Sequence, residues 1–233
     1  MSTEPQQPHP PSPSEVQSPA PLSAIERRIL GVLMEKARTT PDSYPLTLNA
    51  LVTGCNQKTS RNPVMQLSED EVHDALMDMK QKGIVAEVHG AGRVPKFRHL
   101  GYDYLNVKGS EAAVMTELLL RGEQTLGDLR SRASRLDPIP DLAALEGILQ
   151  NLKAKGLIVE LTPPGRGQVI THNLYPADEL EEVRARAAQG IATAPASRAP
   201  SPVATQLEAL QAEVAALCAE LDALKKRVEI LES

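Results

Sequence analysis

Apolar residues recur along the chain in two stretches whose patterns match at a constant offset. Residues 72–88 can be laid on residues 145–161 without a gap, and the shared apolar positions follow the i, i+3, i+4, i+7 spacing of a helix with one buried face. A glycine follows the last apolar turn in both copies, at Gly83 and Gly156, and glycine at this place is typical of a helix C-terminus. The pattern therefore predicts an internal duplication with the same helix in each copy.

A β-hairpin is predicted after each of these helices. The segments Ile84 to Val88 and Leu157 to Leu161 are apolar and rich in β-branched residues, as strands are. A turn containing glycine follows each segment, and strand-like runs return at Val94 to Leu100 and Gln168 to Leu174. Each copy should therefore end in two antiparallel strands.

Two further helices are predicted ahead of the repeated one in each copy. In the first copy, Ser23 with Glu26 marks the start of the first helix, and Ser68 with Glu71 marks the start of the repeated third helix. Both pairs have the spacing of a capping box, in which the two residues exchange side-chain to backbone hydrogen bonds at a helix start. The other expected helix starts are Thr47, a position near Glu111, and Thr125. Three helices followed by a hairpin, twice over, is the order of two tandem winged-helix domains.

The last part of the chain has the heptad pattern of a coiled coil. Its apolar residues alternate spacings of four and three from Val203 onward, and Leu at most d positions with Val at alternate a positions favours two parallel strands. A helix that folds back on its own chain is the alternative interpretation. The predicted dimerisation residues are Leu207, Leu210, Val214, Leu217, Leu221, Leu224, Val228 and Leu231.

Changes in composition set the expected boundaries. Residues 1–21 contain seven prolines and few apolar side chains, so burial cannot offset the entropy of ordering them. The fold class expected is α+β, mainly α. The expected organisation is a disordered Pro-rich leader at 1–21, winged-helix domains at 22–107 and 108–176, a short helix and flexible linker at 177–202, and a coiled-coil dimerisation helix at 203–233.

Three long polar-rich segments resemble the bacterial YceH-like family. They run from Thr39 to Leu46, from Cys55 to Met65 and from Leu119 to Arg132, and the resemblance extends over residues 22–176. It implies a fold of tandem winged-helix domains. The family is uncharacterised, so the resemblance implies no activity and no ligand.

The charge distribution argues against a conventional nucleic-acid module. The net charge is −5, residues 22–107 carry 11 basic against 10 acidic side chains, and residues 108–176 carry 8 of each. Nucleic-acid modules usually have a basic excess, because neutralising phosphates supplies most of their affinity. No apolar run reaches the length of about 18 residues that spans a bilayer, and residues 1–21 do not read as a signal peptide, so a cytoplasmic protein is expected.

The third helix of the first copy has an acidic outward face, which would repel phosphates, and the basic residues lie on wings and loops. Wing arginines can enter a minor groove or hold phosphates, so contact of that kind stays open. The candidate nucleic-acid or partner contacts are Lys58, Arg61, Arg93, Lys96, Arg98, Arg130 and Arg132.

No catalytic or cofactor motif is apparent. The cysteines, Cys55 and Cys218, have no His and acid at an activating spacing, and of the five histidines only His89 and His99 are expected to approach each other, which is too few for a zinc site. Phosphate-binding glycine motifs are absent. The loop from Cys55 to Met65 is interpreted as joining the two domains, with ligand binding as the alternative.

These observations favour a non-enzymatic, dimeric binding protein without a cofactor. The first hypothesis is a protein-interaction scaffold, because the core is near neutral and the third helix is acidic. The alternative is a DNA-binding transcriptional regulator that contacts duplex DNA through its wings and loops. The expected partners are a second copy of the chain and a protein that the sequence does not identify.

Overall fold

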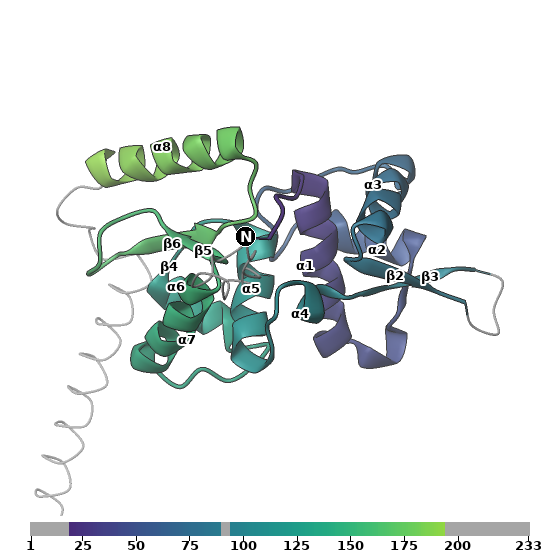
Figure 1. Cartoon of the computed structure of the whole chain (residues 1–233), viewed down its shortest axis with the longest axis horizontal. Helices are drawn as coiled ribbons and strands as arrows, with labels where there is room; N and C mark the ends of the chain where they lie inside the picture. Colours follow the sequence, from purple (N-terminus) through teal and green to yellow (C-terminus); the bar gives the residue numbers. More distant parts are fainter. Residues whose placement is uncertain (1–18, 90–93, 194–233) are drawn as a thin grey trace, which may run out of the picture. The chain divides into compact units, whose positions relative to one another are not determined.

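The computed structural model describes residues 19–89 and 94–193, and over these ranges the fold is α+β and mainly helical (Figure 1). We call residues 22–107 the first half and residues 108–176 the second half. The first half contains α1 (Ala24–Thr39), η1 (Pro41–Ser43), β1 (Leu46–Thr47), α2 (Leu48–Cys55), α3 (Glu69–Gln81), β2 (Val85–Val88), β3 (Lys96–His99) and α4 (Gly101–Tyr104). The second half contains α5 (Gly109–Arg121), β4 (Gln124–Thr125), α6 (Leu126–Ala133), α7 (Leu142–Ala154), β5 (Ile158–Glu160) and β6 (Val169–His172), and α8 (Ala177–Thr193) follows it.

The helix starts predicted from capping residues are confirmed. Ser23 and Glu26 form both bonds of a capping box at α1, and Ser68 with Glu71 does the same at α3. The Thr125 hydroxyl accepts a hydrogen bond from the Asp128 N–H at the start of α6. Local polar residues therefore satisfy backbone N–H groups that the first helical turn leaves without partners.

Each half has a three-stranded antiparallel sheet with the same strand order. The orders are β1-β3-β2 and β4-β6-β5, so the last strand of each half lies in the middle. The register pairs Val85 with His99 in the first half and Ile158 with His172 in the second half. The expectation that His89 and His99 approach each other is therefore wrong, because the antiparallel register sets His99 opposite Val85, at the other end of β2 from His89.

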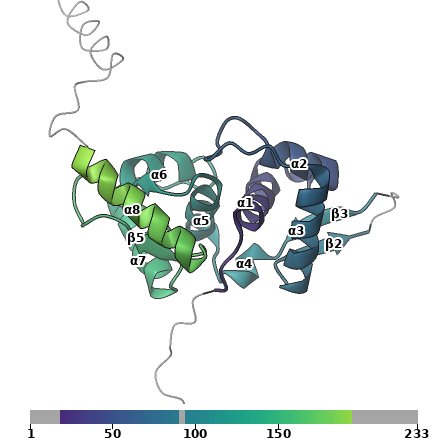
Figure 2. The same cartoon turned by 90° about the horizontal axis from the view of Figure 1, so that it is seen from above.

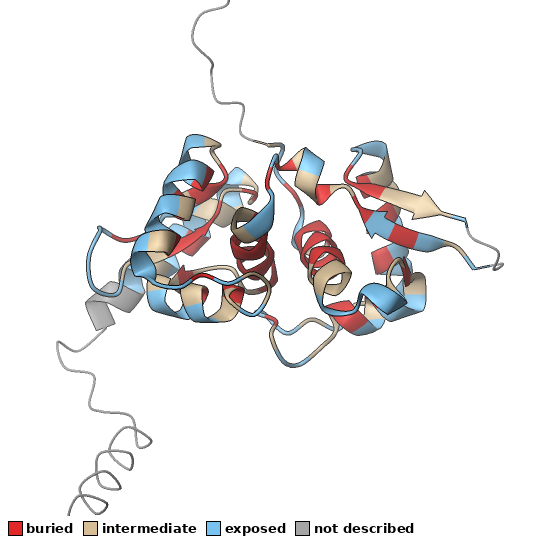
Figure 3. Cartoon of the chain, turned by 90° about the horizontal axis from the view of Figure 1, so that it is seen from below, coloured by how far each residue is buried: buried red, intermediate tan, exposed pale blue. Residues whose placement is uncertain are grey.

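The two halves pack through α1 and α5, which lie side by side in one continuous apolar core. Every residue from Glu26 to Met34 on α1 is buried, and so is every residue from Ala112 to Leu120 on α5. A Cβ on Gly31 would lie 2.9 Å from Leu120 Cδ2, so the helices meet closely at this glycine. Each central helix therefore packs on its own half and on the other half, as the buried helices in Figure 3 show.

The connection between α2 and α3 also joins the halves. It crosses toward α5 (Figure 2), where the Asn62 N–H donates to the Leu120 carbonyl at 3.0 Å and the Asn62 side-chain amide donates to the Arg121 carbonyl at 3.2 Å. The Leu22 N–H donates to the Leu174 carbonyl at 2.9 Å. The interpretation of residues 55–65 as a joining segment is supported by the two bonds of Asn62.

Several sequence expectations fall outside the described residues. They concern the leader up to residue 18, Arg93, the linker from residue 194 and the whole heptad segment 203–233. The short helix expected after residue 177 is present as α8, and its Val183 is buried. Among the described helices, none combines the length and hydropathy needed to cross a membrane.

Candidate functional site

A groove of about 870 Å³ lies in the second half between α7, the β5–β6 hairpin and the start of α6. Its accessible lining surface is mainly apolar, and Leu142 at the first turn of α7 is 47% exposed. An exposed leucine in a concavity whose surface is mainly apolar is more typical of a binding surface than of plain solvent-facing surface. The apolar lining residues are Leu126, Leu142, Leu149, Ile158, Pro164 and Ile170.

Three of the residues that line the groove are glycines. Gly127 lies in the wall formed by α6, and a Cβ added there would meet no atom within 4 Å. Gly165 and Gly167 have φ of +139° and +83°, conformations that favour glycine, and they let the hairpin turn back over the groove. Glycines in α6 and in the hairpin turn therefore line the groove without side chains that would narrow it.

The charges on the groove rim are nearly balanced. Lys153 Nζ lies 2.9 Å from Glu160 Oε2, so these two charges pair with each other. Glu146 and Arg166 also line the groove and add one charge of each sign. A near-neutral, apolar groove suits the side chains of a protein partner better than it suits the phosphates of a nucleic acid.

The equivalent surface of the first half is acidic. Its third helix, α3, exposes five carboxylates, and Lys80 pairs with Glu87 as Lys153 pairs with Glu160 in the second half. The five carboxylates belong to Glu69, Asp70, Glu71, Asp74 and Asp78. The offset of 73 residues replaces them in α7 with Leu142, Ala143, Ala144, Gly147 and Asn151.

Three of the candidate contact residues have exposed side chains. Lys96 and Arg98 are exposed on β3, where they alternate with the buried Phe97 and His99. Lys58 is exposed on the connection between α2 and α3. These three positions are open to a ligand on the surface.

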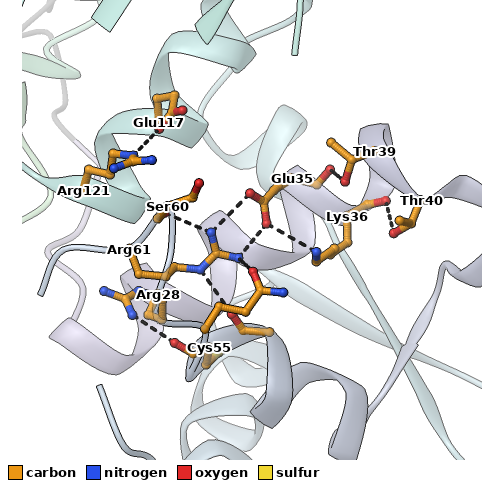
Figure 4. Close-up of polar contacts among 12 residues, drawn as sticks. Arg28, Glu35, Lys36, Thr39, Thr40, Cys55, Ser60, Arg61, Glu117 and Arg121 are labelled. Carbon is orange, nitrogen blue, oxygen red and sulfur yellow. Dashed lines mark hydrogen bonds and ion pairs between the residues drawn. The ribbon is translucent and has the colours of Figure 1, made fainter. Parts of the chain in front are cut away.

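Arg61 is not available as a surface contact, because its side chain is fully buried. Its guanidinium donates to Glu35 Oε2 at 2.6 Å, to the Gly54 carbonyl at 3.1 Å and to the Gln57 side-chain oxygen at 3.0 Å (Figure 4). The connection turns inward at Ser60, which has a φ of +60°. Arg61 therefore holds this connection against α1 and α2.

Arg130 and Arg132 bind within the second half. Arg130 donates to the carbonyls of Ile139 and Pro140, and it fastens the segment that leads into α7. Arg132 donates to the Gln124 side-chain oxygen at 2.6 Å and pairs with Asp128 at 3.8 Å. Both guanidiniums are partly buried and have structural partners.

Two buried histidines occupy equivalent places at the ends of β3 and β6. Burial lowers the pKa of His99 to about 4 and that of His172 to about 3. Each Nδ1 accepts a hydrogen bond from the backbone N–H two residues later, at Gly101 and Leu174. Both imidazoles are therefore neutral at pH 7. Each forms a hydrogen bond with the backbone just after the last strand of its hairpin.

Cys55 is buried, and burial raises the pKa of its thiol to about 12. A thiol with that pKa stays protonated at neutral pH, and a nucleophilic cysteine requires the thiolate. In the ranges 19–89 and 94–193, no group of three or more His, Cys, Asp or Glu residues is placed to hold a metal ion.

Sequence reasoning missed a second concavity, which is lined by Arg27, Arg28, Arg121 and Arg186. The signal available in the sequence was the pair Arg27-Arg28 inside the apolar run of α1. Two adjacent cations on a helix that is buried on several sides require partners or a ligand.

Comparison with known proteins matches residues 22–166 to the family described as "Protein of unknown function, DUF480". The chain is 52% identical over 166 residues to a UPF0502 protein of Rhodopirellula baltica, covering 71% of this chain and 70% of the relative. It is 43% identical over 208 residues to a UPF0502 protein of Dechloromonas aromatica, covering 88% and 92%. A UPF0502 protein of an Acidovorax strain is 40% identical over 221 residues, covering 91% and 96%.

Proposed function

The chain belongs to the DUF480 family of UPF0502 proteins, which is the YceH family, and we propose that it is a non-enzymatic scaffold that binds a protein partner. The observation that carries the proposal is the apolar groove beside α7. We place an apolar segment of the partner in that groove, with Leu142 at the centre of the contact.

The proposed architecture is two winged-helix units held as one body. The order helix, short strand, two helices and hairpin, together with a sheet in which the last strand is central, supports this assignment in both halves. In such a unit the third helix and the wing form the usual binding face, and the groove lies between these two elements in the second half. The position of the groove is thus where the proposed fold class binds its partners.

The proposed scaffold is a homodimer that pairs through the heptad residues 203–233. The unbroken alternation of apolar residues in that segment supports two parallel strands. Light scattering of the full chain should give twice the monomer mass, and removal of residues 203–233 should give the monomer mass. A monomer mass for the full chain at tens of micromolar protein would contradict the dimer.

One chain offers a matched pair of variants for testing the groove. Leu142→Glu gives α7 the residue that α3 carries at the equivalent position, and Glu69→Leu makes the reverse change. Both side chains are exposed, so neither change should unfold the protein. The tagged full-length protein is captured from a lysate of its own cells after nuclease treatment. We expect a protein partner to be captured with the wild type and with the Glu69→Leu variant, but not with the Leu142→Glu variant.

A second candidate function, DNA binding, is favoured by the two exposed cations on β3. Lys96 and Arg98 lie two residues apart on one strand and project to the solvent-facing side. If each holds a phosphate, replacing both with alanine should weaken binding to a duplex about tenfold or more, and the wild-type affinity should fall steeply with salt. Capture that is abolished by nuclease and by these two changes, but not by Leu142→Glu, would favour DNA over a protein partner.

A further inference from the structure

A polar cavity of about 300 Å³ lies where the two halves and α8 meet. The first half contributes the start of α1 and the Asn62–Pro63 turn, and the second half contributes the end of α5 and the residues around Tyr175. This volume is at the lower end of the range, about 300–1,000 Å³, of small-molecule sites. The charged residues on its wall are Arg27, Arg28, Arg121, Glu123, Glu179 and Arg186.

Arg27 closes one side of the cavity, and its charge is already balanced. Its guanidinium pairs with Glu179 of α8 and donates to the Leu22 carbonyl. It also lies 4.4 Å from the centre of the Tyr175 ring, at the distance of a cation–π contact. Arg27 therefore fixes the cavity wall without an added ligand.

Arg28 is different, because it is a buried cation that no carboxylate contacts. It is 2% exposed, and its terminal nitrogens donate to the neutral carbonyls of Cys55, at 3.0 Å, and Pro63, at 2.6 Å. Its Nε has no hydrogen-bond partner. Burial, with Arg61 as a further cause, lowers the pKa of Arg28 to about 10, so the group is charged at pH 7 and poorly compensated.

Arg121 has only part of a partner. Its Nε lies 3.2 Å from Glu117 Oε2, but the geometry makes no hydrogen bond, and Glu117 also pairs with Arg135 at 3.0 Å (Figure 4 shows the Arg121 contact). Within the described part of the chain, the terminal nitrogens of Arg121 have no hydrogen-bond acceptor. These nitrogens can therefore receive an anion.

The charges on the cavity wall do not cancel. Four arginines face two glutamates, since Arg186 lies 3.6 Å from Glu123 and Arg27 pairs with Glu179. His172 also lines the cavity and adds no charge at neutral pH. The cavity thus has an excess of two positive charges, and these are the charges of the poorly compensated Arg28 and Arg121.

We propose that this cavity binds a small oxyanion that carries a carboxylate or a phosphate group. The guanidinium fork matches both groups, because its parallel N–H donors meet two oxygens of one ligand. Residues of both halves and of α8 line the cavity, so a bound anion would link these parts. It would stabilise the folded state by an amount that rises with the logarithm of its concentration above the Kd.

Binding can be measured on the full chain with inorganic phosphate and with citrate as probes. We expect each titration to raise the melting temperature, followed by circular dichroism, above that in potassium chloride of equal ionic strength. Isothermal titration calorimetry should then give one site per chain for at least one probe. A response to phosphate alone or to citrate alone would identify which of the two groups the cavity prefers.

Variants separate the cavity from general effects of charge. Arg121→Gln should weaken binding about tenfold or more, since a charge-assisted pair of hydrogen bonds is lost. Arg186→Gln should weaken it about two- to threefold, because its side chain is largely exposed at the rim and screened by solvent. Arg184→Gln is the matched control on α8, since Arg184 is exposed, pairs with Glu181 and does not line the cavity.

The melting temperature of each variant without anion shows whether it folds. Because Arg186 lies at an exposed rim, Arg186→Gln keeps the test valid even if Arg121→Gln is unstable. The proposal is overturned if neither probe exceeds the chloride control at 10 mM. It is also overturned if Arg184→Gln weakens binding as much as Arg121→Gln or Arg186→Gln does.

Discussion

The third helices of the two halves, α3 and α7, share a framework and differ in the surface they present. Each has 13 residues, each ends before a glycine with positive φ, and each has a lysine that pairs with a glutamate on the following strand. Five exposed positions carry carboxylates on α3, and the equivalent positions on α7 carry leucine, alanine, glycine or asparagine, although α7 also exposes Glu146 and Lys153 elsewhere. The duplication has kept the residues that build the fold, so the function of each half should be sought where the copies differ.

The hairpins differ in the same way. On β3 the exposed positions are Lys96 and Arg98, and the offset of 73 puts Val169 and the buried Thr171 at these positions on β6. The first half therefore presents charge on its helix and on its hairpin, whereas the second half presents an apolar groove. We therefore expect the two proposed winged-helix units to make different contacts.

The largest effect should come from the connection between the second and third helices, which is longer in the first half. Residues 56–68 form a longer connection than residues 134–141, and Arg61 anchors it by a buried pair with Glu35. Arg61→Met should lower the free energy of unfolding by about 3–5 kcal/mol, because the partly buried Glu35 keeps only a 3.8 Å contact with Lys36 and the Gly54 carbonyl loses its donor. Urea unfolding followed by circular dichroism measures this change.

The exposed pair of the second half is the control for that prediction. Lys153 is 59% exposed in its pair with Glu160, so Lys153→Met should change the free energy of unfolding by less than about 1 kcal/mol. Equal effects of the two substitutions would show that the connection in the first half is not anchored by Arg61.

The two buried histidines should make both halves sensitive to acid. Their folded pKa values, about 4 for His99 and about 3 for His172, are below the unfolded value, so the unfolded state binds more protons as the pH falls below about 6.5. Stability should therefore fall between pH 7 and pH 5 by about 2 kcal/mol for each histidine. His172→Gln should reduce this dependence by about half of the total, measured as urea unfolding at both pH values.

The prediction for the histidines fails if His172→Gln and the wild type lose the same stability between pH 7 and pH 5. That result would mean that His172 accepts a proton in the folded state without disturbing β6.

Substitution of two glycines compares the interface between α1 and α5 with the solvent-exposed surface of α7. Gly31→Ala should cost about 1–3 kcal/mol, because the added Cβ would lie 2.9–3.2 Å from atoms of Leu119 and Leu120. Gly147→Ala on α7 meets nothing within 4 Å and should stabilise the protein by about 0.5–1 kcal/mol through helix propensity. Opposite signs in thermal unfolding would support the packing of α1 on α5, and a gain for Gly31→Ala would contradict it.

Local sequence signals predicted the elements well because the relevant interactions are local. Ser23, Ser68 and Thr125 cap helices through residues within one turn, and the glycines after the third helices end them in the same way. The offset of 73 residues predicted equivalent helices and hairpins, which the structure confirms.

The site could not be predicted in the same way, because it depends on contacts between distant residues. Arg61 resembles an exposed loop cation until Glu35, 26 residues earlier, is brought beside it. The groove is lined by Gly127, Gly165 and Gly167, where an added Cβ would meet open space, and a sequence pattern does not show an empty volume. The arginine cavity needs α1, α5 and α8 together.

We propose the groove of the second half as the contact for a protein partner. Photo-crosslinking in the protein's own cells tests this contact. One variant of the full chain carries the photo-reactive residue benzoylphenylalanine in place of Leu142, and a second variant carries it in place of Glu69, the equivalent position of the first half. Irradiation should produce a nuclease-resistant protein adduct from the Leu142 position and none from the Glu69 position. Adducts of equal yield from both positions, or a nuclease-sensitive adduct at Leu142, would contradict the claim.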